Sequence, residues 1–180
     1  HYFDIFITPN IINYCRINHQ LFNMRVAFLT SGGNAPCLFA SVGRLIERYS
    51  SEFSEIQMFG YVNGFSGLLT GEIVEFDLSD AKENIDIFYK YGGTPIGNSR
   101  VKLTNAQDCF DKKLVSMDEN PLEVASNQLI KDSIDILHPI GGDDTNTTAR
   151  DLCNYINSKG YKITVVGIPK TIDNDIYPIR

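Results

Sequence analysis

The chain has 180 residues, which is enough for one domain with a full hydrophobic core. Its net charge is −6 and its lysines and arginines do not cluster, which argues against a nucleic-acid-binding surface; no apolar run approaches the roughly 18 residues of a membrane span. The four cysteines are scattered without zinc-site spacing, which is typical of a reducing compartment and predicts a cytoplasmic protein.

The first part of the chain predicts alternating strands and helices. Residues 1–23 have neither a strand nor a helix period and are expected to form an extension outside the fold. From Met24 onward, apolar runs predict strands at Arg25–Thr30 and Ile56–Tyr61 and an edge strand at Ile73–Phe76. Helices are predicted from Pro36 onward and at Ala81–Tyr91. Turn residues predict turns at 31–36 and Asn63-Gly64 and a loop at Thr94–Thr104.

The second part continues the same alternation. Pro121 opens a helix, and the segments that follow predict a strand at Asp135–Ile140, a helix at Asp144–Ser158 and a strand at Ile163–Ile168. Alternating strands and helices with continuous apolar strands predict an α/β fold, a doubly wound, mainly parallel sheet with helices on both faces. His138 lies inside an expected strand and is interpreted as a core residue rather than a catalytic one.

Two polar strings follow the last two expected strands. They are GGDDT at 141–145 and PKTIDND at 169–175. The carboxyl ends of parallel strands are where open α/β sheets bind ligands, so these strings are expected on one rim. That rim would carry Asp143, Asp144, Asp173, Asp175 and Lys170. This set suits a phosphate chain and a metal held beside a hydroxyl that loses its proton.

The GGDDT string has two interpretations. One acidic residue at a helix start is explained by N-capping and by the helix dipole. Two adjacent carboxylates, Asp143 and Asp144, would repel a phosphate unless a divalent cation lay between them. Mg²⁺ fits, because it is commonly held by one or two carboxylates together with substrate phosphates.

The PKTIDND string carries the groups for proton and phosphoryl transfer. Asp173 could accept a proton from a substrate hydroxyl, and Asp175 could orient Asp173 or a metal-bound water. Lys170 could neutralise a transferring phosphoryl group. The alternative is a polar surface loop with an Asn-Asp turn.

Two further segments are candidates for phosphate contacts. Ser31-Gly32-Gly33 follows a strand and precedes a helix, so its backbone N–H groups could cradle an anion, although a plain strand–helix turn explains it as well. Arg100, at the end of the 94–104 loop, could clamp a phosphate with two hydrogen bonds or be a solvated side chain.

These strings resemble the phosphofructokinase family in order and spacing: TSGG, GGTPIGNSR, IGGDDTNTTA and VVGIPKTIDND. The resemblance covers 24–180, which is expected to be an N-terminal donor-binding domain truncated at its C-terminus. ATP-using members have GGDGS and PGTIDND, whereas Asp144 and Lys170 here match pyrophosphate-dependent members. The Asp144 side chain fills space and repels charge where the α-phosphate of ATP would pass.

The resemblance implies a role for each matching residue. Asp173 is implied as the general base on the 1-hydroxyl of fructose 6-phosphate, and Asp143 as the Mg²⁺ ligand. Asp144 and Lys170 are implied to set the donor and stabilise the transition state. Pyrophosphate is implied to meet Gly33, Arg100 and Asp144, and the sugar phosphate to meet Thr171, Asp173 and Asp175.

The implied reaction is reversible phosphoryl transfer from pyrophosphate to fructose 6-phosphate in glycolysis, by a homo-oligomer. The family residues that grip the 6-phosphate lie beyond Arg180, so the chain is expected not to turn over alone. Three alternatives stay open: an ATP-dependent 6-phosphofructokinase, a kinase of NAD or lipids with a GGDG-type turn, and a non-catalytic regulatory relative or fragment.

Overall fold

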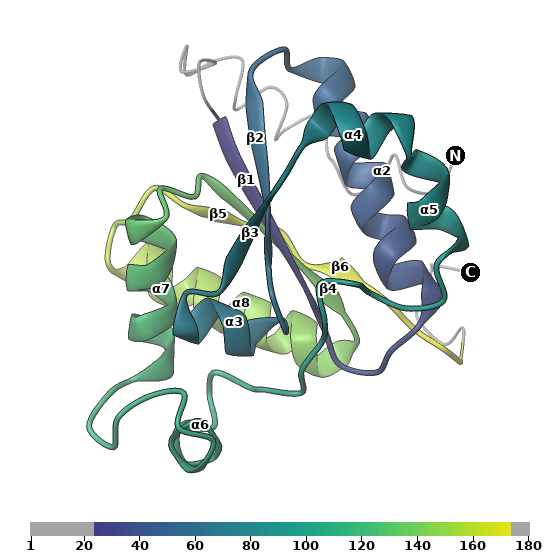
Figure 1. Ribbon diagram of the computed structural model, residues 1–180. Helices are drawn as coiled ribbons and strands as arrows, with labels where there is room; N and C mark the ends of the chain where they lie inside the picture. Colours follow the sequence, from purple (N-terminus) through teal and green to yellow (C-terminus); the bar gives the residue numbers. More distant parts are fainter. Residues whose placement is uncertain (1–23, 174–180) are drawn as a thin grey trace.

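A central sheet organises the protein, of which the computed structural model describes residues 24–173. The expected extension at 1–23 and Asp175 lie outside the described residues. The strands run in the order β3-β2-β1-β4-β5, and β6 also pairs with β4 (Figure 1). Their bounds are β1 Met24–Ser31, β2 Ile56–Tyr61, β3 Ile73–Phe76, β4 Ile136–Gly141, β5 Thr164–Val165 and β6 Ile168–Pro169.

The strand pairing confirms the predicted fold class. β1 pairs in parallel with β2 and β4, and β4 pairs in parallel with β5 and β6. Only the β2–β3 pair is antiparallel among the described pairs. β3 stands at the end of the strand order, so it is the edge strand that was expected. The parallel register brings the carboxyl ends of β1, β4 and β6 together, with Ser31 opposite Gly141 and Gly141 opposite Pro169.

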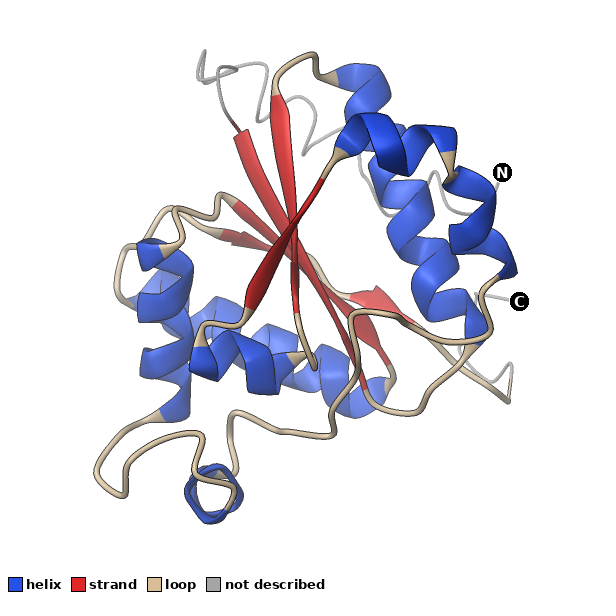
Figure 2. Cartoon of the chain, viewed as in Figure 1, coloured by secondary structure: helices blue, strands red, loops and turns tan. Residues whose placement is uncertain are grey.

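Helices cover both faces of the sheet (Figure 2). One face carries α2 (Pro36–Glu52), α4 (Leu78–Glu83) and α5 (Ile85–Lys90), and the other carries α3 (Phe65–Thr70), α7 (Pro121–Lys131) and α8 (Asp143–Ser158). The short helix α6 (Ala106–Asp111) lies in the long connection before α7. Side chains alternate along β1, so Val26 and Phe28 join one apolar cluster while Ala27 and Leu29 join the other.

Two predicted elements differ from the structure, and two helices were not predicted. The helix predicted at Ala81–Tyr91 is two helices, because Asn84 ends α4 and its side-chain amide bonds the Asp80 carbonyl at 3.1 Å and carboxylate at 3.0 Å. The glycine-rich segment after Asn63-Gly64 contains α3, and α6 was not predicted at all. The predicted strand Ile163–Ile168 is broken between β5 and β6.

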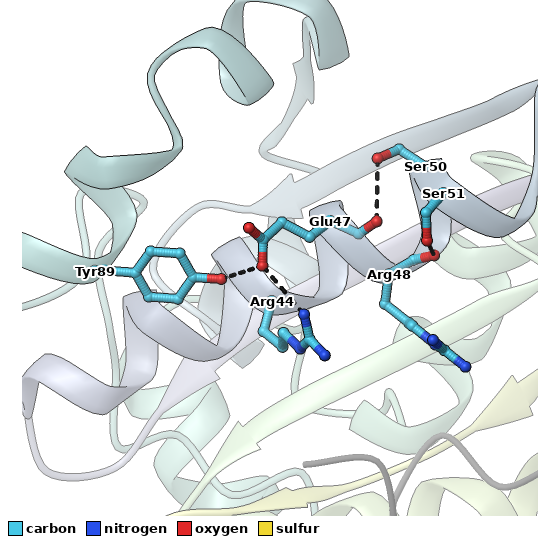
Figure 3. A network of polar contacts seen from close by, with 6 residues as sticks. All are labelled: Arg44, Glu47, Arg48, Ser50, Ser51 and Tyr89. Atoms are coloured by element: carbon cyan, nitrogen blue, oxygen red, sulfur yellow. Dashed lines mark hydrogen bonds and ion pairs between the residues drawn. The ribbon is translucent and has the colours of Figure 1, made fainter. Parts of the chain in front are cut away.

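Polar contacts attach α5 to the outer side of α2 (Figure 3). The Tyr89 hydroxyl donates to the Glu47 carboxylate, which also pairs with Arg44 at 3.4 Å. Partial burial and the bond to Glu47 raise the pKa of Tyr89 to about 12, so its hydroxyl stays protonated and keeps donating. None of the helices within residues 24–173 is long and apolar enough to cross a membrane.

Candidate active site

The turn after β1 is tied to the 94–104 segment by backbone and side-chain hydrogen bonds. Gly32 N donates to Ser99 O at 2.9 Å, and the Ser31 hydroxyl donates to the same oxygen at 2.8 Å. The Asn98 amide in turn donates to Gly32 O at 2.8 Å. These bonds hold the backbone next to Arg100 at the edge of the sheet where Gly33 lies, although the exposed Arg100 side chain has no partner among the described residues.

The turn after β4 places two carboxylates in the first turn of α8. The N-cap is Gly142, which has no side chain, so neither Asp143 nor Asp144 is the capping residue that the simpler interpretation required. Both are exposed. Within residues 24–173 no hydrogen bond or ion pair holds the Asp143 carboxylate, whereas Asp144 Oδ2 pairs with Lys102 Nζ at 2.8 Å.

The Asn146 side chain holds this turn by hydrogen bonds to two of its backbone carbonyl groups. Its amide nitrogen donates to Gly141 O at 2.8 Å and to Gly142 O at 3.0 Å. A Cβ on Gly167 would lie 2.4 Å from the amide oxygen of Asn146, so a side chain at position 167 would push the Asn146 amide aside. This insertion accompanies the break between β5 and β6 and joins the GGDDT turn to the segment that precedes Lys170.

Lys170 lies beside the glycine turns that follow β1 and β4. Its backbone N–H donates to Gly141 O at 2.8 Å, which continues the β4–β6 pairing. A Cβ built on Gly33 would lie 3.4 Å from Nζ of Lys170, so the ammonium lies against the backbone of the first turn. The side chain is half-buried, and no carboxylate pairs with it among the described residues. A positive charge without a partner is thus fixed where three strands end.

Asp173 and Thr171 lie beyond Lys170 at the end of the described chain. Asp173 is exposed, and its backbone N–H donates to the Thr171 hydroxyl at 3.2 Å. Because Asp173 follows Lys170 by only three residues, this turn keeps Asp173 at the same edge of the sheet. No described contact joins Asp173 to Asp143, Asp144 or Arg100, and Asp175 lies outside the described residues.

Sequence reasoning missed Lys102, Asn146 and Asn98. Lys102 stands between Val101 and Leu103, which are both buried, so the alternation of the segment could have shown that Lys102 faces outward. Asn146 had no such signal, because its partners are backbone carbonyls of its own turn. The Asn98 amide oxygen is buried without a hydrogen-bond partner in the described part of the chain.

His138 is a core residue, as predicted. It is fully buried on β4, and its Nδ1 donates to Val166 O at 3.3 Å, so its Nε2 accepts from the Tyr49 hydroxyl at 2.8 Å. Burial lowers the pKa of His138 to about 4, which keeps the imidazole neutral near pH 7. Its bond to Val166 turns that carbonyl inward at the break between β5 and β6.

The donor set can hold Mg²⁺ only with help from a substrate. No group of three or more histidine, cysteine or acidic side chains close enough to bind a metal occurs among residues 24–173. The exposed, unpaired Asp143 carboxylate instead offers one or two oxygens. That is the protein share typical of a Mg²⁺ ion whose other ligands are phosphate oxygens and water.

The chain is similar in sequence to known phosphotransferases and phosphofructokinases. The chain is 52% identical over 156 residues to the pyrophosphate–fructose 6-phosphate 1-phosphotransferase of Propionibacterium freudenreichii, covering 87% of this chain and 38% of that protein. It is 32% identical over 153 residues to the ATP-dependent 6-phosphofructokinase 2 of Streptomyces coelicolor, covering 85% of this chain and 38% of that one. The chain therefore spans about two fifths of the length of these relatives.

The fold has solved counterparts as well. The crystal structure of a pyrophosphate-dependent phosphofructokinase from Marinobacter aquaeolei superposes with a TM-score of 0.68 at 22% sequence identity, over 86% of this chain and 35% of that one. At that identity the likeness concerns the fold alone. The sequence model of the family described as phosphofructokinase matches residues 25–179. The chain thus belongs to the phosphofructokinase family.

Proposed function

We propose that this chain is the donor-binding part of an enzyme that transfers phosphoryl from pyrophosphate to fructose 6-phosphate. The products are fructose 1,6-bisphosphate and phosphate. The observation that carries the proposal is Lys170, which lies against Gly33 without a carboxylate partner among the described residues. A half-buried lysine with its ammonium beside one glycine turn and its backbone bonded to the other favours a small, highly charged anion.

The proposed step uses residues of this edge of the sheet. Asp173 accepts the proton of the 1-hydroxyl as that oxygen attacks the terminal phosphorus of pyrophosphate. The bond from that phosphorus to the bridging oxygen breaks, and phosphate leaves. Lys170 neutralises charge that develops on the transferring group, and positioning supplies much of the rate. Thr171 contacts the sugar phosphate and Arg100 the phosphoryl chain, and the sequence motif assigns Asp175 to the sugar phosphate as well.

Two acidic residues complete the part of the proposed site that binds pyrophosphate. Asp143 would hold Mg²⁺ together with pyrophosphate oxygens, and the ion would screen the negative charge of the donor. Asp144 occupies a position where ATP-using members have glycine, so its side chain and charge oppose the α-phosphate of ATP. The proposed enzyme is a cytoplasmic homo-oligomer of glycolysis, and the free thiols of Cys37, Cys109 and Cys153 fit a reducing compartment.

The experiment that tests the proposal compares donors in the whole protein that carries this chain. Phosphoryl transfer to fructose 6-phosphate is measured with Mg²⁺ and either pyrophosphate or ATP. We expect turnover with pyrophosphate only. Turnover with ATP would contradict the assignment of the donor to Asp144 and Lys170. Turnover with neither donor would favour a regulatory relative or another phosphate acceptor.

A further inference from the structure

The ion pair between Lys102 and Asp144 joins two segments that are distant in the sequence. Lys102 Nζ lies 2.8 Å from Asp144 Oδ2, across the space between the 94–104 segment and the first turn of α8. Asp144 is the residue to which the proposed function gives the choice of donor. Lys102 is thus the one cation paired with that carboxylate among the described residues.

The backbone of Lys102 is held in place by its neighbours, so the lysine side of the ion pair has a defined position. Val101 and Leu103 on either side are buried in the core beneath α3, α7 and α8. The Lys102 carbonyl accepts from Asn105 N at 3.0 Å and from the Cys109 thiol at 3.6 Å. Three residues earlier, Ser99 is bonded to Gly32. The lysine therefore starts from a rigid segment that also holds the turn after β1.

The pair contributes little to the stability of the fold. The Lys102 and Asp144 side chains are 48% and 72% exposed. Ion pairs between exposed side chains typically add less than about 1 kcal/mol, because water screens them and both side chains lose conformational freedom. Their effect on geometry is larger, since an exposed aspartate without a partner samples several rotamers.

We propose that Lys102 is a positioning residue that sets donor specificity by holding Asp144 in place, an inference that rests on the proposed function. The ion pair keeps the Asp144 carboxylate between the 94–104 segment and α8. Pyrophosphate is short enough to bind Mg²⁺ and Lys170 without disturbing it. A nucleotide continues beyond its β-phosphate and has to displace the paired carboxylate, so the pair opposes ATP more strongly than Asp144 would alone.

The test uses Lys102→Met in the whole protein, which keeps most of the length of the unbranched side chain and removes its charge. We expect the KM for pyrophosphate to rise and the inhibition constant of ATP against pyrophosphate to fall, each by about two- to fivefold, the factor that corresponds to one exposed ion pair. The kcat should change little, and Lys102→Arg should restore both constants. The matched control is Lys112→Met, which removes a 47% exposed lysine paired with Asp108 at 2.6 Å outside the site.

A double-mutant cycle separates positioning from direct contact. Equilibrium binding of pyrophosphate with Mg²⁺, measured by calorimetry, needs no turnover and is compared in Lys102→Met, Asp144→Asn and the double variant. We expect Lys102→Met to have no further effect once Asp144 is neutral. An equal loss in both backgrounds would overturn the inference, because Lys102 would then contact pyrophosphate itself. Unchanged constants in Lys102→Met would also overturn it, whereas a wild-type protein inactive with pyrophosphate would overturn the proposed function first.

Discussion

Nζ of Lys170 lies beside the open side of Gly33, at 3.4 Å from the place that a Cβ at position 33 would take. The turns after β1 and β6 therefore share one surface, with the ammonium between them. Because 3.4 Å is an ordinary contact distance, an alanine fits there without forcing the backbone to move. A methyl group would nevertheless occupy the place where a phosphate oxygen can meet both the ammonium and the turn.

Gly33→Ala is expected to weaken pyrophosphate binding without unfolding the protein. We expect the KM for pyrophosphate to rise about tenfold, which is 1.4 kcal/mol of binding free energy. The melting temperature should match that of the wild type. Gly92→Ala is the control, because a Cβ on Gly92 meets nothing within 4 Å. An unchanged KM in Gly33→Ala would place the donor away from this turn.

Replacing Asp144 and Lys170 together by glycine is expected to abolish the use of pyrophosphate. In the proposed mechanism, the double variant removes the charge that faces the transferring group and the carboxylate that shapes the donor site. We expect kcat/KM for pyrophosphate to fall at least about a hundredfold, as for other losses of charge stabilisation in a transition state. Exposed residues outside the site, Asp118 and Lys162, provide a matched pair of glycine substitutions. Retained turnover with pyrophosphate in the double variant would refute the donor assignment.

The fold could largely be predicted from the sequence because its long elements have local signals. Pro36 and Pro121 begin α2 and α7, and β2 and β3 have the predicted bounds. One error lies where distant residues decide, because Asn146 and His138, which contact Gly167 and Val166, accompany the break between β5 and β6. The other errors are local: Asn84 ends α4, and Gly67 in α3 packs so closely on its own turn that a Cβ there would lie 1.8 Å from Val62 O.

The candidate site, like the fold, could be predicted only in part from the sequence. Motif residues such as Lys170 and Asp144 could be placed at strand ends, because parallel strands end at a common edge. Their partners could not, because the contacts of Lys170 with Gly33 and of Asp144 with Lys102 depend on how separate segments pack. No local period or cap signals such pairs.

Asn146→Ala is expected to destabilise the protein because it removes two hydrogen bonds from the turn after β4. Gly141 O and Gly142 O both accept from the Asn146 amide, and they keep their bonds from the backbone N–H groups of Lys170 and Asn146. We expect a loss of about 1–3 kcal/mol in the free energy of unfolding, at about 0.5–1.5 kcal/mol for each hydrogen bond. Urea unfolding of the whole protein measures it. Asn154→Ala, at an exposed position of α8, should change stability little.

Asp173→Asn is expected to remove the general base while keeping the shape of the turn. Its backbone N–H, which bonds the Thr171 hydroxyl at 3.2 Å, is unaffected by the substitution. We expect kcat to fall about a hundredfold or more, in the range of general-base catalysis. The KM for fructose 6-phosphate should change much less. A kcat within a few-fold of the wild type would assign the proton transfer to another group.

His138 is expected to make the stability of the protein depend on pH below neutrality. Its pKa is about 4 in the folded state and 6.5 for a histidine exposed to water, so the unfolded chain binds the proton first as pH falls. The stabilisation is present in full above pH 6.5 and is lost as pH falls toward 4. That loss is on the order of 3 kcal/mol, from 1.36 kcal/mol for each pKa unit.

The substitution His138→Asn isolates this effect. The asparagine amide can still donate to Val166 O but does not titrate, so the variant should be less stable near pH 7 and should lose less stability on acidification. Carboxylates contribute equally to both proteins, and the difference between their urea-unfolding curves from pH 7 to pH 4 reports His138 alone. Parallel pH dependences for the two proteins would show that the buried imidazole is not the titrating group.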